Sequence, residues 1–306
     1  EDEYDLYYSK IGYGYNFQYT RNNLQFNRQD GMFSEVGLYS GMYATDWSWS
    51  GLLMDFDNDG LKDLFVSNGV PKRMNDIDYI NYVSGDELQA KMRSDKLNEG
   101  DMAMINKFPQ TKIPNRLFKN TGDLKFQDIV ADVPGNLPSY SNGAIYADLD
   151  NDGDLDLVTN NINQPSAIFR NDANKLSGNN YLRLRLKGEK KNTLAIGAKV
   201  IVYCDSLMQT AEQLVTRGYQ SSVSPVLHIG LGKSQKIDSL RVIWPSGKMK
   251  LLKDVAFNST LQLNEADANE IFHFASEHIK TLLHPLNNVI AYHHVENATN
   301  DFKRQP

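Results

Sequence analysis

Two nearly identical acidic loops constrain this chain more than any other feature. The first is Asp55-Phe56-Asp57-Asn58-Asp59-Gly60-Leu61-Lys62-Asp63, and the second is Asp148-Leu149-Asp150-Asn151-Asp152-Gly153-Asp154-Leu155-Asp156. Each places a carboxylate at loop positions 1, 3, 5 and 9 and a glycine at position 6. Alternate residues of a tight loop can point at one centre, and Ca²⁺ takes about 6–8 oxygen ligands at about 2.3–2.6 Å. The glycine permits the sharp turn that a side chain would obstruct.

The loops therefore predict two Ca²⁺ sites. The predicted side-chain ligands are Asp55, Asp57, Asp59 and Asp63 in the first loop and Asp148, Asp150, Asp152 and Asp156 in the second. Leu61 and Asp154 occupy position 7, where a backbone carbonyl would bind the ion. We expect Asn58 and Asn151 to stabilise the turn rather than bind metal. The alternative is an acidic turn without metal, although carboxylates crowded into one turn repel each other when no cation is present.

An EF-hand begins with the same spacing but needs a glutamate at position 12 and a helix on each side. Position 12 is Val66 in the first loop and Thr159 in the second. The flanking runs Leu64-Phe65-Val66 and Leu157-Val158-Thr159 are short, apolar and prone to form strands. The loops are thus predicted to connect strands.

The loops belong to a longer repeat with a period of 93 residues (148 − 55). The register holds without a gap from the pair Leu24/Leu117 to the pair Asp63/Asp156. A third start, residues 167–171, resembles residues 115–120. Repeated short-strand units predict a propeller or a related array of stacked sheets, because one unit cannot bury its apolar face alone. Two or three repeats are too few for a closed propeller of about 4–8 blades.

Between the acidic loops, residues 84–107 are rich in helix formers and contain no proline. They predict a helical insert, which would either cover apolar surface or form a binding loop. From about Asn179 the acidic loops stop and apolar alternation begins, as in Tyr181–Lys187, whose leucines would face inward. The rest of this half predicts about seven strands in a β-sandwich.

Composition excludes some classes of function. The net charge of −6 and the isoelectric point of about 5.6 disfavour binding of nucleic acid by a basic face. The single cysteine, Cys204, permits no intrachain disulfide and is expected in the core. The sequence contains no apolar run of about 18 residues, so no transmembrane helix is predicted. The start, Glu1–Asp5, does not resemble a signal peptide, so we expect that processing removed one or that the chain is an excised piece.

No catalytic or organic cofactor-binding residue is predicted. His228 lies in an apolar strand pattern and is expected to be a packed or surface residue. The other histidines fit no zinc spacing; they are His273, His278, His284, His293 and His294. Four carboxylates at calcium spacing favour a ligand shell over an acid–base pair. Five tyrosines near Trp47 and Trp49 suit either glycan stacking or packing between sheets, and we favour packing; they are Tyr13, Tyr15, Tyr19, Tyr39 and Tyr43.

Four short sequences stand out in the C-terminal half: Ala195-Ile196-Gly197-Ala198, Arg217-Gly218-Tyr219-Gln220-Ser221, His228-Ile229-Gly230-Leu231-Gly232 and Val242-Ile243-Trp244-Pro245-Ser246-Gly247. Together they make residues 180–265 resemble the ASPIC/UnbV domain. The N-terminal part resembles the FG-GAP/VCBS repeats that accompany this domain, since Trp47-Ser48-Trp49 precedes the first acidic loop. The resemblance implies an all-β fold, with calcium-binding propeller-type repeats followed by a β-sandwich-like domain. It implies an exported or surface location and no known reaction.

The expected domains are propeller-type repeats over 1–178, an ASPIC/UnbV domain over 179–265, and a linker over 266–306 that leads towards a further repeat set. The favoured function is a calcium-stabilised binding or scaffold module that recognises a protein or a glycan outside the cell. An enzyme acting on polysaccharides and a subunit of an outer-membrane surface complex remain alternatives, because fold resemblance does not fix function.

Overall fold

The computed structural model describes residues 4–17, 19–71, 77–106, 110–205 and 207–273, and every structural statement below concerns these residues. The chain divides into two units, and the fold described here is that of the first, Glu1–Phe272. Most of the expected linker, residues 274–306, and the histidines from position 278 onward lie outside the described residues, whereas its first part, residues 266–273, is described and includes the strand β17 (Glu270–Ile271). In this part, no helix has both the length and the apolar character needed to cross a membrane.

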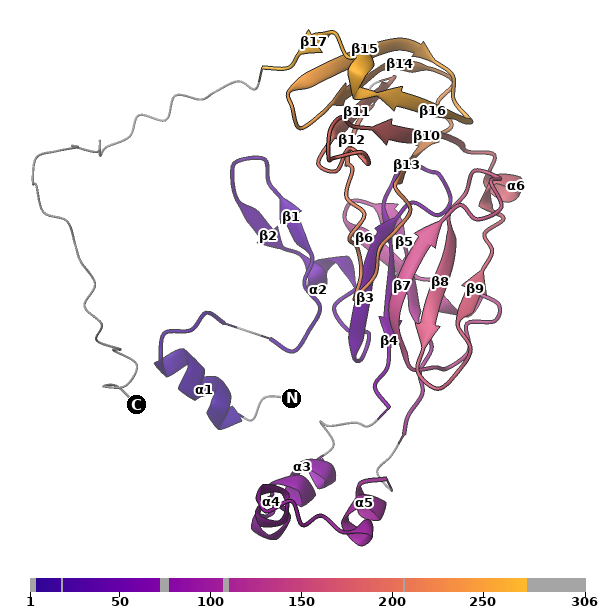
Figure 1. Ribbon diagram of the computed structural model, residues 1–306. Coiled ribbons are helices and arrows are strands. Elements are labelled where there is room, and N and C mark those ends of the chain that lie inside the picture. The colour runs from indigo at the N-terminus through magenta and orange to yellow at the C-terminus, as the bar shows by residue number, and fades with distance from the viewer. Residues whose placement is uncertain (1–3, 18, 72–76, 107–109, 206, 274–306) are drawn as a thin grey trace, which may run out of the picture. The chain divides into compact units, whose positions relative to one another are not determined.

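The described fold is mostly β-sheet, as the sequence predicts, and its sheets do not close into a barrel (Figure 1). The helices are short: α1 (Tyr4–Gly12), α2 (Gly37–Ser40), α3 (Ile77–Ser84), α4 (Asp86–Arg93), α5 (Glu99–Asn106) and α6 (Ala173–Ser177). Three of them, α3 to α5, form the helical insert, which begins at Ile77 and so earlier than the sequence pattern predicts. Within it the Lys91 ammonium contacts the carboxylates of Glu87 and Asp101, each at 3.1 Å.

The first repeat sheet is an antiparallel meander interrupted by the helical insert. Its strands in order are β3 (Ser48–Met54), β4 (Asp63–Asn68), β5 (Arg116–Gly122) and β6 (Lys125–Asp128). Strand β4 is buried along its whole length, because one apolar cluster around Leu52 and Phe65 covers one face and another around Leu64 and Phe118 covers the other. The first acidic loop joins β3 to β4.

The second repeat sheet reproduces the first at the predicted interval. It contains β7 (Ser141–Ala147), β8 (Asp156–Asn161) and β9 (Ala167–Phe169). Strands β7 and β8 begin and end 93 residues after β3 and β4 (141 − 48 and 156 − 63). A register break also recurs, between Ser48 and Gly51 in β3 and between Ser141 and Ala144 in β7. The 93-residue register is therefore repeated in the structure as well as in the sequence.

The start of the third repeat, residues 167–171, also contains a strand, β9. Phe169 of β9 pairs with Leu157 of β8, as Phe118 of β5 pairs with Leu64 of β4. The two repeat sheets pack face to face through Leu52, Met54 and Phe65 of the first and Ala144, Leu155 and Leu157 of the second region.

A separate hairpin precedes these sheets, formed by β1 (Gln25–Asn27) and β2 (Phe33–Glu35). The five tyrosines expected to pack between sheets lie in and around this region, and all five are exposed, with Tyr13 at 85%. The packing expectation is wrong for them. Trp49, in contrast, packs on Tyr219, with ring centroids 4.7 Å apart.

The C-terminal half forms two facing sheets around one core. One sheet has the order β13 (Val226–Gly232), β10 (Asn180–Lys187) and β16 (Ser259–Asn264). The other has the order β12 (Leu207–Glu212), β11 (Lys199–Cys204), β14 (Ile237–Ile243), β15 (Lys248–Val255) and β17 (Glu270–Ile271). The count is eight strands rather than seven, because β17 adds two residues at an edge.

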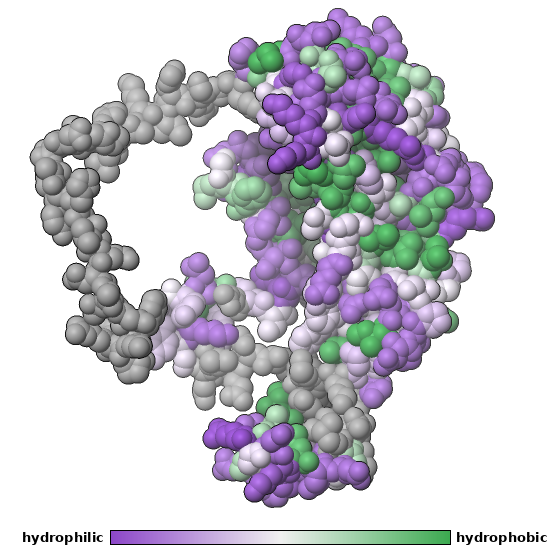
Figure 2. All heavy atoms as spheres, in the orientation of Figure 1, coloured by the Kyte–Doolittle hydropathy of each residue, from purple (hydrophilic) through white to green (hydrophobic). Residues whose placement is uncertain are grey.

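The predicted inward face of β10 is confirmed, since Leu182, Leu184 and Leu186 are at most 6% exposed. Cys204 and Trp244 share their core, at 3% and 1% exposure. On the face drawn in Figure 2, hydrophobic residues form several groups separated by hydrophilic ones rather than one continuous apolar surface.

Candidate metal centre

Both acidic loops adopt the same backbone turn. Asn58 and Asn151, at position 4, have left-handed φ values of 59° and 62°, and Gly60 and Gly153 both have a φ of 93°. The N–H of each glycine donates to the position 1 aspartate of its own loop, Asp55 or Asp148, at 3.0 Å in both copies. Asparagine and glycine are the residues that tolerate left-handed backbone, so the sequence favours this turn locally.

The position 9 aspartate closes each turn. The Asp63 carboxylate accepts from the backbone N–H groups of Phe56 (3.2 Å) and Asn120 (2.8 Å). Asp156 accepts from Leu149 and Asn171, each at 2.8 Å. Asn120 and Asn171 are the last residues of the two similar segments 115–120 and 167–171, and their N–H groups connect β5 and β9 to the loops.

The carboxylates converge in both loops, but not in the same combination. In the first loop, oxygens of Asp55, Asp57 and Asp59 lie within 4.8 Å of one another. In the second, the converging set is Asp148, Asp150 and Asp156. Of the predicted ligands, Asp63 and Asp152 therefore lie outside the converging sets, although both belong to the same turns. Leu61 and Asp154 were predicted as carbonyl ligands only; the Leu61 side chain is exposed, whereas that of Asp154 is buried.

The buried carboxylates are short of partners. Asp55 Oδ1 and Asp148 Oδ1, the same atom in the two copies, are buried without a hydrogen-bond partner among the described residues. Burial raises the pKa of Asp55 and of Asp63 to about 7, and burial raises that of Asp154 to about 7 beside the Asp152 carboxyl. A buried anion without a partner is costly, and a bound cation removes that cost. The donor set and the unpartnered oxygens therefore fit a hard, oxygen-seeking metal ion.

Basic residues also reach the loops. In the first loop, Lys119 of β5 pairs with Asp57. In the second, the Arg183 Nη1 atom of β10 lies 2.5 Å from Asp148 Oδ2, and both side chains are almost fully buried. Lys175 of α6 lies 3.9 Å from Asp152.

The outer face of the β13–β10 pair covers both loops. Arg183 and His228 are directly opposite each other across this pair. His228 Nε2 lies 2.6 Å from Asn58 Oδ1, and Arg183 Nη2 donates to Asn151 Oδ1 at 3.3 Å. Two neighbouring side chains of one sheet thus contact the equivalent asparagine of each loop.

Asn58 also links the two loops to each other. Its Nδ2 atom donates to the Gly153 carbonyl (3.0 Å) and to Asn174 Oδ1 (2.8 Å), so its Oδ1 faces His228 as an acceptor. His228 must then donate from Nε2. Burial, with Lys62 and Arg183 nearby, lowers the pKa of His228 to about 3, which keeps the ring neutral.

The glycines of the sequence His228–Gly232 allow β13 to approach the first loop. A Cβ on Gly230 would lie 2.1 Å from Asp55 Oδ2, and the Gly232 N–H donates to the Asn58 carbonyl at 2.8 Å. Ile229 and Leu231, which point the other way, are buried in the core. The Tyr181 ring of β10 packs directly against Gly153, where an added Cβ would lie 2.0 Å from the ring.

Sequence reasoning found the loops but missed what covers them. Arg183, Asn174 and Tyr181 carry no motif that distinguishes them from other surface residues of their segments. His228 was expected to be a packed or surface residue, and it is the partner of Asn58. For Asn120 and Asn171, which donate to the position 9 aspartates, the signal was the resemblance between residues 115–120 and 167–171.

Comparison with known proteins agrees with the architecture of the C-terminal half. The family model described as ASPIC and UnbV matches residues 188–270. Cartilage acidic protein 1 of Homo sapiens is 27% identical over 269 residues, which cover 79% of this chain and 40% of the relative. The Mus musculus and Xenopus tropicalis proteins of the same name are each 25% identical, over 79% and 78% of this chain.

This chain thus spans about two-fifths of the length of these curated relatives. The protein therefore contains an ASPIC/UnbV domain at residues 188–270 and is a homologue of cartilage acidic protein 1.

Proposed function

We propose that the protein is an extracellular or cell-surface recognition and scaffold module, in which two bound Ca²⁺ ions stabilise propeller-type FG-GAP/VCBS repeats and their junction with the ASPIC/UnbV domain. The observation that carries this proposal is the duplicated unpartnered oxygen, Asp55 Oδ1 and Asp148 Oδ1. Each belongs to a loop that holds three converging carboxylate oxygens. The relatives are named for cartilage, a tissue made largely of extracellular matrix, which supports a location outside the cell.

Calcium would have a structural role in this arrangement. Asp55, Asp57, Asp59 and Asp63 would hold one ion with the Leu61 carbonyl, and Asp148, Asp150, Asp152 and Asp156 would hold the other with the Asp154 carbonyl. The ion supplies positive charge to buried carboxylates that otherwise repel each other. Asn58, His228 and Arg183 connect the stabilised loops to each other and to the β13–β10 pair.

The test is calcium-dependent melting of the whole chain. A ligand that binds only the folded state stabilises by about 2.7 kcal/mol at a hundred times its dissociation constant, or about 5 kcal/mol for two sites. At about 2–4 °C per kcal/mol, we expect calcium to raise the melting temperature by on the order of 10 °C over the chelated protein.

The combined substitution Asp57→Ala and Asp150→Ala should remove most of that rise. Asp132→Ala, an exposed aspartate outside the loops, is the matched control and should keep it. Melting curves that coincide with and without chelator for the parent protein would contradict the proposal.

A further inference from the structure

The ASPIC/UnbV domain meets the second repeat sheet around residues 216–222. The segment 216–222 is closed by a bridge between Thr216 and Ser222. It contains the sequence Arg217–Ser221 that contributed to the ASPIC/UnbV resemblance. Between this loop and strands β7 and β8 lies a cavity of about 350 Å³, which falls in the range of small-molecule binding sites.

The loop is held firmly against the first repeat sheet. The Tyr219 N–H donates to Ser50 Oγ at 2.8 Å, and Ser50 Oγ in turn donates to the Asn142 carbonyl at 2.8 Å. The Tyr219 ring packs on Trp49, whose Nε1 donates to the Gly69 carbonyl at 2.8 Å. The cavity wall is therefore formed before any ligand arrives, which lowers the entropy cost of binding.

The backbone of the loop is unusual on both sides of Tyr219. Gly218 has a φ of 75°, and a Cβ there would lie 3.1 Å from the Ala144 carbonyl oxygen. Gln220 has a φ of 46°, a left-handed value that non-glycine residues rarely adopt. Such strain persists where surroundings fix it, and it clusters at binding sites. Here it accompanies a glutamine side chain that lines the cavity.

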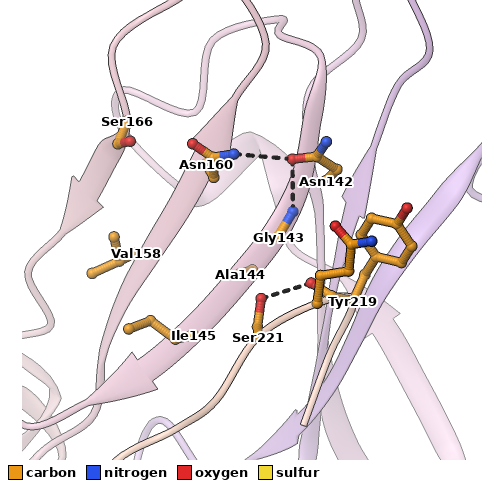
Figure 3. Close-up of a pocket in the computed structure, with 10 residues that line it drawn as sticks. Asn142, Gly143, Ala144, Ile145, Val158, Asn160, Ser166, Tyr219 and Ser221 are labelled. Carbon is orange, nitrogen blue, oxygen red and sulfur yellow. Dashed lines mark hydrogen bonds between the residues drawn. The ribbon is translucent and has the colours of Figure 1, made fainter. Parts of the chain in front are cut away.

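The lining is polar but uncharged. Figure 3 shows Ser166, Asn160 and Asn142 in a row, Val158 and Ile145 further along the same strands, and the loop with Tyr219 and Ser221 on the other side. The Asn142 carboxamide oxygen accepts from the Gly143 N–H (2.8 Å) and from Asn160 Nδ2 (3.3 Å). Among the described residues, the Gln220 amide has no hydrogen-bond partner, so it is available to a ligand.

This chemistry selects one class of ligand. The lining has no lysine or arginine to pair with a phosphate or a carboxylate, and no aspartate or glutamate to hold a metal ion. Side-chain amides and hydroxyls offer both donors and acceptors, which is what the hydroxyl groups of a sugar require. Tyr219, Ile145 and Val158 offer apolar contact to the C–H faces of a sugar ring. A glycosidase would need a pair of carboxylates, which this lining lacks.

We propose that the cavity between segment 216–222 and strands β7 and β8 binds a neutral sugar unit of a glycan, without hydrolysing it. This names the ligand class of the recognition module proposed above, and so rests on that function. Asn160, Gln220 and Ser166 would contact the hydroxyl groups, and Tyr219 would contact the ring.

The test is saturation-transfer NMR on the whole, calcium-saturated chain. The probes are the methyl glycosides of glucose, galactose, mannose and N-acetylglucosamine, with cellobiose and lactose, each at millimolar concentration. Glucose 6-sulfate is the charged comparison. We expect transfer to at least one neutral sugar and none to the sulfate ester, since no cation lines the cavity.

The variant is Asn160→Ala with Gln220→Ala, two exposed residues whose loss leaves the Ser50 and Trp49 anchors of the loop intact. We expect its affinity for the bound sugar to fall about tenfold, because two hydrogen bonds are lost. Gln235→Ala, an exposed glutamine outside the cavity, should bind as the parent does. Unchanged melting of both variants would show that the effect is local.

Three results would overturn the proposal: no transfer to any neutral sugar, equal transfer to the sulfate ester, or unchanged affinity in the double variant. Each of these results can be distinguished from a refutation of the proposed calcium-stabilised module. If calcium still raises the melting temperature while no sugar binds, only the sugar site is refuted. If calcium has no effect on melting, the module proposal is refuted whatever the sugar result.

Discussion

Replacement of Arg183 by methionine tests whether the second acidic loop exchanges a protein cation for a metal ion. Arg183 and Asp148 form a nearly fully buried pair, with side-chain exposures of 7% and 4%. Removing one member of a buried pair costs about 3–5 kcal/mol, because the other charge stays buried without a partner. Asp148 can escape part of this cost by taking up a proton, so we expect about 3 kcal/mol at pH 7 in the presence of a chelator.

Calcium should change that penalty. A bound ion neutralises Asp148 itself, and the variant then loses only packing and the hydrogen bond to Asn151, or about 1 kcal/mol. The difference of about 2 kcal/mol is a coupling energy, and linkage requires that calcium bind the variant about thirtyfold more tightly at this loop. The parent guanidinium and the ion would thus oppose each other for one carboxylate.

The assay is thermal melting of Arg183→Met and the parent in chelator and in excess calcium. At about 2–4 °C per kcal/mol, the chelated variant should melt roughly 6–12 °C below the parent, and the gap should shrink to a few degrees in calcium. Arg185→Met is the matched control, because Arg185 lies on the same strand and is exposed. An equal gap in both conditions would refute the idea that Asp148 binds the ion.

Two further outcomes follow from the contacts between the loops and the sheet. Gly153→Ala should destabilise the chain by several kcal/mol in melting experiments, since its Cβ would overlap the Tyr181 ring. Gly247 has a similar φ of 86° in open space, so Gly247→Ala should cost only the backbone strain of about 1–2 kcal/mol. Equal losses of stability in the two variants would show that the Tyr181 ring moves freely. For His228, the folded-state pKa of about 3 lies below the unfolded value, so the unfolded state binds more protons between about pH 6.5 and 3 and stability falls as the pH falls through that window. Denaturant titrations should show about 1–2 kcal/mol lost between pH 7 and pH 5 that is absent in His228→Gln, and identical pH profiles would exclude His228 as the cause.

The repeat and its loops could be predicted from the sequence because their information is local. The spacing of aspartates along one turn indicates that carboxylates converge there, although it does not fix which three converge in each loop, and the apolar runs beside them indicate strands. Strands β7 and β8 therefore begin where the 93-residue register requires. The inward face of β10 was equally accessible, because alternation alone defines it.

The contacts above the loops were not accessible in this way. The alternation of apolar and polar residues places Arg183 on the outer face of β10 but does not indicate which residues contact that face. Trp49 and Tyr219 are 170 residues apart (219 − 49), and nothing in either segment indicates that their rings pack. The tyrosines near the N-terminus show the converse, since their clustering in the sequence suggested packing between sheets, although all five side chains are exposed.

The two acidic loops are nearly identical in sequence, yet their surroundings should give them different affinities for calcium. The cation paired with a ligand of the first loop, Lys119, is 38% exposed and can turn towards water when an ion binds Asp57. The cation paired with the second loop, Arg183, is buried and also hydrogen-bonded to Asn151, so its guanidinium cannot move away from Asp148 into water. Binding an ion beside it leaves two positive charges near Asp148, which costs affinity. Calorimetric titration of Asp150→Ala, which retains the first site, should therefore give tighter binding than titration of Asp57→Ala, which retains the second. The reverse order would mean that loop sequence, rather than the neighbouring cation, sets the affinity of each site.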